Sequence, residues 1–222
     1  MSDDVRARPL GGAGIGTEIT SVDQLVDLLG EPMPRVRDKA RPALIDLDRD
    51  WLAASPFCLV ATASAAGHCD VSPKGDPAGQ LVRVLDDRTI AIAERPGNRR
   101  ADGYRNILQN PHVGLVFLIP GRGDTLRING RARLVAEADF FDDMVVKGHR
   151  PVLAVVVDID EVFHHCAKAF VRSALWDPET WNPTGRVPRR AVVAQRTERP
   201  DTSLEELDAY YEAAKYNATV YG

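Results

Sequence analysis

Short apolar segments joined by tight turns fill the middle of the chain, and they limit its fold more than any other feature. Four of these segments form two pairs, with a few turn-prone residues inside each pair: Phe57–Ala63 with His68–Ser72, and Leu81–Leu85 with Thr89–Ala93. Segments of this length and composition are typical of strands, and connections this short join antiparallel neighbours. Strands and helices do not alternate along the chain, which excludes a doubly wound parallel sheet.

The next part of the chain adds a helix and longer strands. Residues Asn98–Gln109 repeat apolar side chains at helical spacing, and an Asn-Pro pair ends the predicted helix because the residue before proline avoids the helical region. We expect the apolar run His112–Ile119 to be a strand buried on both faces, whereas Thr125–Val135 alternates and predicts one wet face. Two further elements follow, a short helix at Asp139–Val146 and a long strand at Val152–Val162. Six or seven strands in this arrangement predict a mainly β fold, a largely antiparallel barrel with flanking helices.

Helical arms are predicted on both sides of the barrel. We divide the chain into an N-terminal arm with a short helix over residues 1–42, a barrel domain over 43–180, and a C-terminal extension with a helix over 181–222. Capping boxes mark the helix of the arm, at Ser21 and Gln24, and that of the extension, at Ser203 and Glu206. Two segments are predicted as helices on their apolar spacing, Ile45–Ala54 and Leu204–Tyr216.

Composition limits the classes of partner. The 222 residues include 28 Lys and Arg against 32 Asp and Glu, a net charge of −4, which argues against nucleic acid or an anionic membrane as partner. The longest apolar run, Pro151–Val157, is far shorter than a membrane span, and the acidic start of the sequence does not resemble a secretory signal. Three cysteines make a poor disulfide framework, so we expect reduced thiols in a cytoplasmic protein.

Two other motifs carry less weight. His164, His165 and Cys166 could contribute to a zinc site, but neighbours on a strand point to opposite faces and the usual ligand spacings are missing. We therefore predict no metal and expect buried cysteines that behave as small hydrophobic residues. The glycine-rich run Gly11–Gly16 follows no predicted strand, so it is not a dinucleotide-binding fingerprint.

The segment Arg95-Pro-Gly-Asn-Arg-Arg-Ala-Asp is the strongest candidate for a binding site. A strand ends there and Asn98 is a natural N-cap, which predicts Arg99 and Arg100 in the first turn of a helix. Positive side chains are unfavourable at that end, because the helix N-terminus already carries partial positive charge. Either an anion binds there through backbone N–H and guanidinium groups, or both arginines pair with acids such as Asp102.

A second positive group could join this site. Lys74 is predicted just past a strand, where Pro73 and Gly75 would form a turn, and Ser72 could donate its hydroxyl to the same ligand. The alternative is a solvated loop lysine, which is the better interpretation of this motif alone.

Taken in order, these motifs resemble a known family. The succession Val-Ser-Pro-Lys-Gly-Asp, two strands, Arg-Pro-Gly-Asn-Arg-Arg, a helix, Asn-Pro, an apolar strand and Thr-Leu-Arg-Ile-Asn-Gly-Arg-Ala is similar to the pyridoxamine 5′-phosphate oxidase superfamily of FMN-binding split barrels. An FMN-dependent branch of that superfamily also carries His-Cys-Ala-Lys-Ala-Phe followed by Arg-Ser-x-Leu-Trp, as this chain does. The resemblance covers roughly Ala43 to Pro178 and implies a six- to seven-stranded antiparallel split barrel.

The resemblance also implies a cofactor and its site. FMN would lie at a homodimer interface, with Arg99 and Arg100 on its phosphate and Thr125 facing the flavin, often from the other subunit. The segment around Trp176 would approach the flavin from the partner, although Trp176 could equally be a core or interface anchor. The full set of implied cofactor residues is Asp70, Val71, Ser72, Lys74, Ala93, Glu94, Asn98, Arg99, Arg100, Thr125, Arg127, Lys168, Arg172, Ser173 and Trp176.

Departures from the family leave the substrate open. The Tyr, Arg and Ser that hold the substrate phosphate in the true oxidase are missing after Thr125–Val135, so pyridoxamine phosphate oxidation is not expected. The resemblance predicts an FMN-dependent oxidoreductase acting on a small-molecule substrate or taking electrons from NAD(P)H, with no side chain assigned a catalytic role. Two alternatives stay open: a flavin-binding carrier or sensor without turnover, and the same barrel using the deazaflavin cofactor F420.

Overall fold

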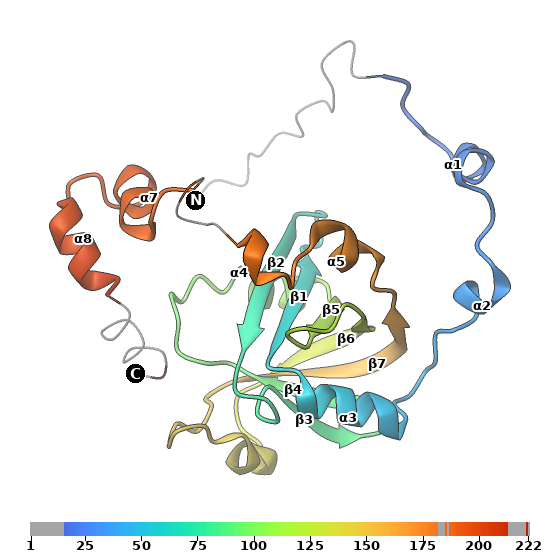
Figure 1. The fold of residues 1–222 in the computed structure, drawn as a ribbon. Coiled ribbons are helices and arrows are strands. Elements are labelled where there is room, and N and C mark those ends of the chain that lie inside the picture. Colours follow the sequence, from blue (N-terminus) through green and yellow to red (C-terminus); the bar gives the residue numbers. More distant parts are fainter. Residues whose placement is uncertain (1–15, 182–184, 186, 213–220, 222) are drawn as a thin grey trace. The chain divides into compact units, whose positions relative to one another are not determined.

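The computed structural model describes residues 16–181, 185, 187–212 and 221 (Figure 1). The chain divides into two compact units, residues 1–39 and 40–222. The domain boundaries drawn from the sequence stay predictions, and the Gly11–Gly16 run lies, apart from Gly16, outside the described residues.

Two short helices make up the regular structure described in the first unit, α1 (Val22–Leu29) and α2 (Pro34–Arg37). The predicted cap of α1 is confirmed, since the Ser21 hydroxyl accepts a hydrogen bond of 3.2 Å from the Gln24 amide. This cap satisfies one of the N–H groups that a helix N-terminus leaves without a partner.

The second unit is built on one antiparallel sheet. Its strands are β1 (Phe57–Ala63), β2 (Cys69–Gly75), β3 (Val82–Asp86), β4 (Thr89–Ala93), β5 (His112–Leu118), β6 (Thr125–Val135) and β7 (Ala154–His165). They pair in the order β2-β1-β5-β6-β7-β4-β3, so β2 and β3 are edges and the sheet is not closed. Both predicted hairpins, β1–β2 and β3–β4, are present. The predicted antiparallel split barrel with seven strands is confirmed.

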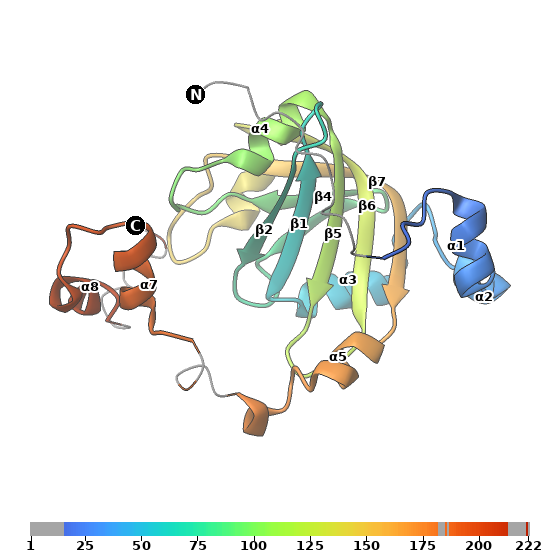
Figure 2. The ribbon, with the colours of Figure 1, turned by 90° about the horizontal axis from the view of Figure 1, so that it is seen from above.

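Helices accompany the sheet. They are α3 (Asp46–Ala54), α4 (Asp102–Gln109), α5 (Lys168–Ser173), α7 (Arg190–Thr197) and α8 (Leu204–Tyr210), with the 3₁₀ helices η1 (Asp139–Met144) and η2 (Pro178–Thr180). Helix α4 packs against β1, β2 and β6. In Figure 2, α4 and α5 lie at opposite ends of β1 and β5, so the two ends of the barrel are built from different parts of the chain.

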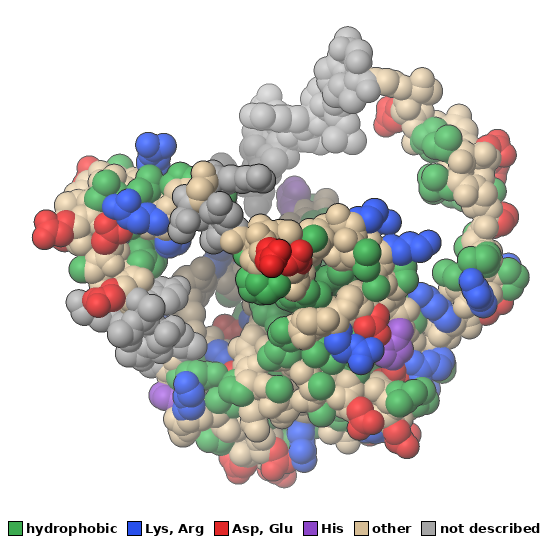
Figure 3. Space-filling view, in the orientation of Figure 1, with side chains coloured by type: hydrophobic (Ala, Val, Ile, Leu, Met, Phe, Trp, Pro, Cys, Tyr) green, Lys and Arg blue, Asp and Glu red, His purple; other side chains and the backbone are tan. Residues whose placement is uncertain are grey.

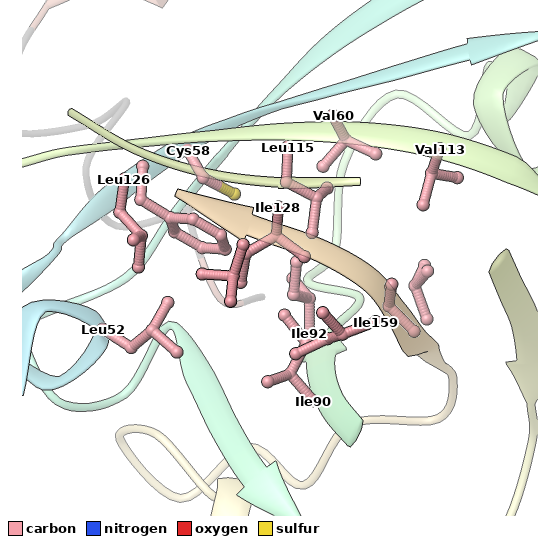
Figure 4. Packing of buried hydrophobic residues seen from close by; sticks show 14 of the residues in the cluster. Leu52, Cys58, Val60, Ile90, Ile92, Val113, Leu115, Leu126, Ile128 and Ile159 are labelled. Atoms are coloured by element: carbon pink, nitrogen blue, oxygen red, sulfur yellow. The ribbon is translucent and has the colours of Figure 1, made fainter. Parts of the chain in front are cut away.

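The sheet curls so that its inner face encloses the core. Inward residues of β1, β5 and β6, among them Cys58, Leu115 and Ile128, face Ile90 and Ile92 of β4 (Figure 4). These side chains are almost fully buried, and burial of apolar area at about 25 cal/mol per Å² stabilises the closed shape. Alternation along β1, β5 and β6 thus places every second residue on the face that encloses this core.

A bulge in β6 depends on Gly130. The register of β6 against β7 shifts between Asn129 and Gly130, and a Cβ on Gly130 would overlap the carbonyl oxygen of Asp158. Glycine is therefore required where the two backbones approach each other.

Replacing Gly130 with alanine is expected to lower the free energy of unfolding by about 1–3 kcal/mol, because the overlap can be relieved only by moving β7. Urea denaturation measures the loss. The control is Gly75→Ala in β2, where the added methyl group would meet its neighbours at an ordinary 3.6 Å. Equal losses in the two variants would contradict the role assigned to Gly130.

Some predicted elements need correction. Strand β5 is buried on one face only: Val113, Leu115 and Phe117 face the core, whereas the alternate residues are half-exposed or exposed. An apolar run cannot by itself reveal which of its faces another element covers. The segment predicted as a short helix at Asp139–Val146 is the 3₁₀ helix η1.

The part of the chain after Trp181 contains a helix that the sequence pattern did not predict. Helix α7 has a narrow apolar face, Ala191 and Ala194, which packs on Leu207 of α8. The predicted capping box of α8, Ser203 with Glu206, is confirmed. Helix α8 ends at Tyr210, and residues 213–216 of the longer predicted helix lie outside the described residues.

Basic and acidic side chains are interspersed on the face shown in Figure 3, without a large field of one sign. Within the described residues, none of the helices has the length and apolar character needed to cross a membrane.

Candidate functional site

A cavity of about 440 Å³ opens beside the edge strand β2. It is bounded by β2, the end of β4, the loop of residues 94–101 and the first turn of α4. The structure brings together eight of the residues implied by the family resemblance in its lining: Asp70, Ser72, Lys74, Ala93, Glu94, Asn98, Arg99 and Arg100. Cavities of this size hold drug-sized ligands and cofactors.

The loop before α4 differs from its prediction. Helix α4 begins at Asp102, and Asn98 is not its N-cap: the Asn98 side chain accepts a hydrogen bond from the Arg100 amide (3.0 Å). Arg99 and Arg100 therefore lie ahead of the helix, while the acidic Asp102 occupies the first turn, where negative charge is favourable. Because the backbone places both arginines ahead of the helix, the predicted repulsion between their charges and the helix N-terminus does not arise.

Two non-glycine residues of this loop have left-handed backbone conformations, Arg99 (φ 59°) and Ala101 (φ 56°). Such conformations cost roughly 1–3 kcal/mol each and persist where the surrounding structure imposes them, commonly at ligand sites. Left-handed residues within a turn can also direct successive backbone N–H groups into an anion-binding concavity. The observed loop therefore suits an anion better than the predicted arrangement, in which both arginines lie in the first turn of a helix.

The two arginines of the loop have different surroundings. Arg100 pairs with Asp102, which raises the pKa of the guanidinium further above its ordinary value. Arg99 is exposed and forms no ion pair within the described part of the chain. One of the two arginines therefore pairs with an acid, as the alternative interpretation of the sequence proposed, and the other does not.

Lys74 lies inside β2, opposite Cys58 of β1, and not in a turn after the strand as predicted. Pro73 is tolerated there because β2 is an edge strand, where a missing N–H need not break a ladder. The Lys74 ammonium group donates hydrogen bonds to the Glu94 carboxylate (2.6 Å) and to the Tyr104 hydroxyl (2.6 Å). Tyr104 in turn donates to Glu94. Lys74 is therefore a half-buried, paired cation in the cavity wall.

A second ion pair lies deeper in the wall. Arg95 Nε donates to Asp76 Oδ2 at 2.8 Å, and the two side chains are 12% and 2% exposed. Arg95 Nη2 also donates to the carbonyl oxygen of Met144 (3.0 Å), while Nη1 is buried and has no partner among the described residues. A buried donor without a partner is unfavourable, so the two contacts at Nε and Nη2 have to hold the guanidinium in place.

The first turn of α4 approaches β2 closely at Gly103. A Cβ on Gly103 would lie 3.2 Å from Asp70 Oδ2 and 3.6 Å from the Thr62 hydroxyl. Thr62 also accepts a hydrogen bond from Asn106 of α4 (3.1 Å). Of these residues Asp70 and Gly103 line the cavity, and the buried bond between Thr62 and Asn106 holds α4 against β1 beside it.

Seven of the implied residues do not line this cavity, namely Val71, Thr125, Arg127, Lys168, Arg172, Ser173 and Trp176. Val71 alternates with the lining residues of β2 and is 59% exposed. The four listed residues from Lys168 to Trp176 lie in or just after α5, at the opposite end of β1 from α4 (Figure 2). Trp176 there stacks on Phe170 and donates to the carbonyl oxygen of Arg122 (2.6 Å).

Residues that the sequence reasoning left out also line the cavity, notably Asp76, Arg95, Asp102, Gly103 and Tyr104. Arg95 and Asp102 stand within the motif that drew attention, and the unusual density of charge there was a usable signal. Tyr104 lies on the α4 turn that faces β2, which helical spacing alone does not reveal.

The prediction that the cysteines are buried holds for only one of them. Cys58 is fully buried in the core, whereas Cys69 and Cys166 are exposed. Cys69 begins an edge strand and Cys166 follows the end of β7, so both stand at strand ends outside the core.

Burial raises the pKa of the Cys58 thiol to about 12. Because the thiolate is the reactive form, Cys58 is expected to stay unmodified when the native protein is treated with iodoacetamide at pH 8, while Cys69 and Cys166 react. Mass spectrometry of the peptides identifies the modified residues. Modification in denaturant is the control, in which all three thiols react; rapid labelling of Cys58 in the native protein would contradict its burial.

The comparisons with known proteins bear on this same region. A sequence model of the pyridoxamine 5′-phosphate oxidase family matches residues 45–166, which include all seven strands and the cavity. The chain belongs to the pyridoxamine 5′-phosphate oxidase family. No curated protein matches the chain.

Solved structures with a similar fold come from several proteins. HupZ of Group A Streptococcus is 20% identical with a TM-score of 0.44 and covers 55% of this chain and 94% of its own. A protein related to general stress protein 26 from Clostridium acetobutylicum, of the pyridoxinephosphate oxidase family, is 11% identical (TM-score 0.41; 54% of this chain, 85% of its own). An F420 reductase is 16% identical (TM-score 0.36; 51% and 93%).

Proposed function

We propose that this member of the pyridoxamine 5′-phosphate oxidase family is an FMN-dependent oxidoreductase that holds the FMN phosphate in the loop before α4. The observation that carries the proposal is Arg99, which has no ion pair among the described residues, beside Arg100 on a cavity-lining loop with left-handed residues. A phosphate dianion needs fixed positive partners and N–H donors, and this loop supplies both.

The residues present fit such a group. The charged side chains in the lining are balanced, with Lys74, Arg95, Arg99 and Arg100 against Asp70, Asp76, Glu94 and Asp102. Three of the cations have an acidic partner, whereas Arg99 has none among the described residues. An incoming phosphate would supply the negative partner that Arg99 lacks there.

FMN would supply the electron transfer, and the protein side chains would bind and orient it. Ala93, at the end of β4, and the buried Leu81 give the cavity an apolar part against which a ring could lie. Lys74, Glu94 and Tyr104 place fixed hydrogen-bonding groups beside it. We assign no side chain as nucleophile, acid or base.

The site is proposed to be completed by a second copy of the chain. Thr125 and Arg127 follow one another on the face of β6 that is turned away from the core residues Leu126 and Ile128. The Nε atom of Arg127 is buried without a partner among the described residues, although its guanidinium lies over the Phe163 ring. A homodimer would bring these residues and those of α5 to the partner's cofactor. Light scattering on flavin-loaded protein tests this, and a monomer with full flavin occupancy would contradict it.

The substrate is proposed to differ from pyridoxamine phosphate, because the substrate-phosphate residues of the true oxidase are missing after β6. NAD(P)H is the proposed electron donor, and a small molecule the acceptor.

The absorption spectrum of the purified protein, before and after incubation with FMN, tests the proposal. Bound flavin bands that bleach anaerobically with NADH or NADPH and return with an acceptor are the expected result. Flavin bands that no donor bleaches would favour a carrier or sensor. Binding of F420 but not of FMN would support the phosphate site and show that the cofactor is F420. Binding of neither would contradict the proposal.

A further inference from the structure

Tyr221 is joined to the cavity wall although it is 145 residues from Asp76 in the sequence. Its hydroxyl donates a hydrogen bond to Asp76 Oδ1 (2.9 Å). Its ring stacks on His149, with ring centroids 6.0 Å apart, and the Lys147 ammonium lies 5.2 Å from the ring centroid. The ring and the hydroxyl of Tyr221 therefore have separate partners.

The Asp76 carboxylate uses both of its oxygens. Oδ2 accepts from Arg95 Nε and Oδ1 accepts from Tyr221, and the side chain is almost fully buried. A buried carboxylate with one donor removed is left with an unsatisfied oxygen and can turn toward another partner. The Tyr221 hydroxyl therefore limits the orientation of Asp76.

Asp76 in turn limits the orientation of Arg95. The guanidinium is held at Nε by Asp76 and at Nη2 by the carbonyl oxygen of Met144, and the buried Nη1 has no partner within the described part of the chain. Arg95 lines the cavity and also begins the segment that leads to Arg99 and Arg100. Two held nitrogens of a planar group fix the position of the third.

We propose that Tyr221 is a positioning residue for the cofactor phosphate, acting through Asp76 to hold the Arg95 guanidinium in the cavity wall and, with it, the start of the loop that carries Arg99 and Arg100. The inference rests on the proposed function and adds to it a residue outside the segment matched by the family model. Burial and the bond to Asp76 raise the pKa of the Tyr221 hydroxyl, so it stays a donor throughout the neutral range.

Tyr221→Phe separates positioning from packing. The variant keeps the contacts of the ring with His149 and Lys147 and removes only the donor to Asp76. Tyr210→Phe is the matched control, because it removes the same atom from a ring that contacts Arg199 and Tyr211 of the α7–α8 region.

The measurement is the dissociation constant of FMN and, separately, of riboflavin, which lacks the phosphate, by quenching of flavin fluorescence. Tyr221→Phe is expected to raise the constant for FMN about three- to tenfold, less than the loss of a direct hydrogen bond to the phosphate because Tyr221 acts through Asp76 and Arg95, and to leave that for riboflavin unchanged. The control variant should change neither. Asp76→Asn should weaken FMN binding with the same selectivity for the phosphate.

Each other outcome counts against the inference. Equal weakening of FMN and riboflavin in Tyr221→Phe would show a general structural role, and unchanged binding of both would show no role. Wild-type protein that binds FMN no better than riboflavin would instead overturn the proposed phosphate site, and the inference with it. The ratio of the riboflavin and FMN dissociation constants of the wild-type protein thus distinguishes failure of the proposed function from failure of the role of Tyr221.

Discussion

Replacing both Arg99 and Arg100 with alanine is expected to weaken FMN binding by roughly 10²- to 10⁴-fold. Hydrogen bonds to charged groups contribute about 1.5–3 kcal/mol each, so two of them contribute about 3–6 kcal/mol, at about 1.4 kcal/mol per tenfold. The fold should be unaffected, because the two side chains lie in an exposed loop ahead of α4. Fluorescence titration gives the affinity and thermal unfolding checks the fold.

A charge-matched control separates a local site from the effect of net charge. Arg88→Ala with Arg196→Ala removes two exposed positive charges from residues that do not line the cavity and form no described ion pair with a lining residue. This double variant should bind FMN within a few-fold of wild type at physiological salt, where distant surface charges are largely screened. If the control and the loop variant lose affinity equally, the phosphate is not bound by the loop.

Lys74→Met is expected to weaken FMN binding by about ten- to a hundredfold. The substitution removes a cation from the cavity wall and also leaves the Glu94 carboxylate, 28% exposed, without its ion-pair partner beside an anionic ligand. Like charges brought together in a partly desolvated site repel each other. Titration with FMN measures the combined effect.

The double variant Lys74→Met/Glu94→Gln tests the physical cause. It removes both charges of the pair, so about tenfold of the lost affinity should return if the unpaired carboxylate is responsible for that part. Lys39→Met, a lysine outside the cavity lining, is the control for the loss of one charge. If the double variant recovers no affinity for FMN, Lys74 binds the ligand directly and the charge of Glu94 does not affect binding.

The strands could be predicted because their signals are local. Phe57–Ala63 and Thr89–Ala93 combine apolar side chains with adjacent turn residues, and both are strands in the structure. Helix α7 was missed because its buried face consists of two alanines, too small to give a periodic signal. The one-sided burial of β5 was missed because coverage of a face is a property of the tertiary structure.

Part of the cavity lining could be predicted from the sequence, but the geometry of the cavity could not. The order of motifs identified the lining residues of β2, β4 and the arginine segment, eight of which share one cavity. The backbone of the loop could not be inferred, because left-handed conformations at Arg99 and Ala101 oppose the intrinsic preference of these residues. Asn98 was assigned as a helix cap on the same local preference.

Ion pairing in the cavity depends on contacts between distant segments. Lys74 meets Glu94 and Tyr104 from 20 and 30 residues away, and Asp76 meets Arg95 from 19. Nothing in the local sequence distinguishes a lysine paired in this way from a solvated one. The same limit applies to Tyr221, whose partner lies 145 residues away.

The most direct test of the central claim is the ratio of the riboflavin and FMN dissociation constants of the wild-type protein, measured by fluorescence quenching at one salt concentration. A phosphate held by the loop before α4 predicts FMN binding at least about a hundredfold tighter than riboflavin, as expected for two hydrogen bonds to a charged group. Equal affinities, or no binding of FMN, would contradict the account.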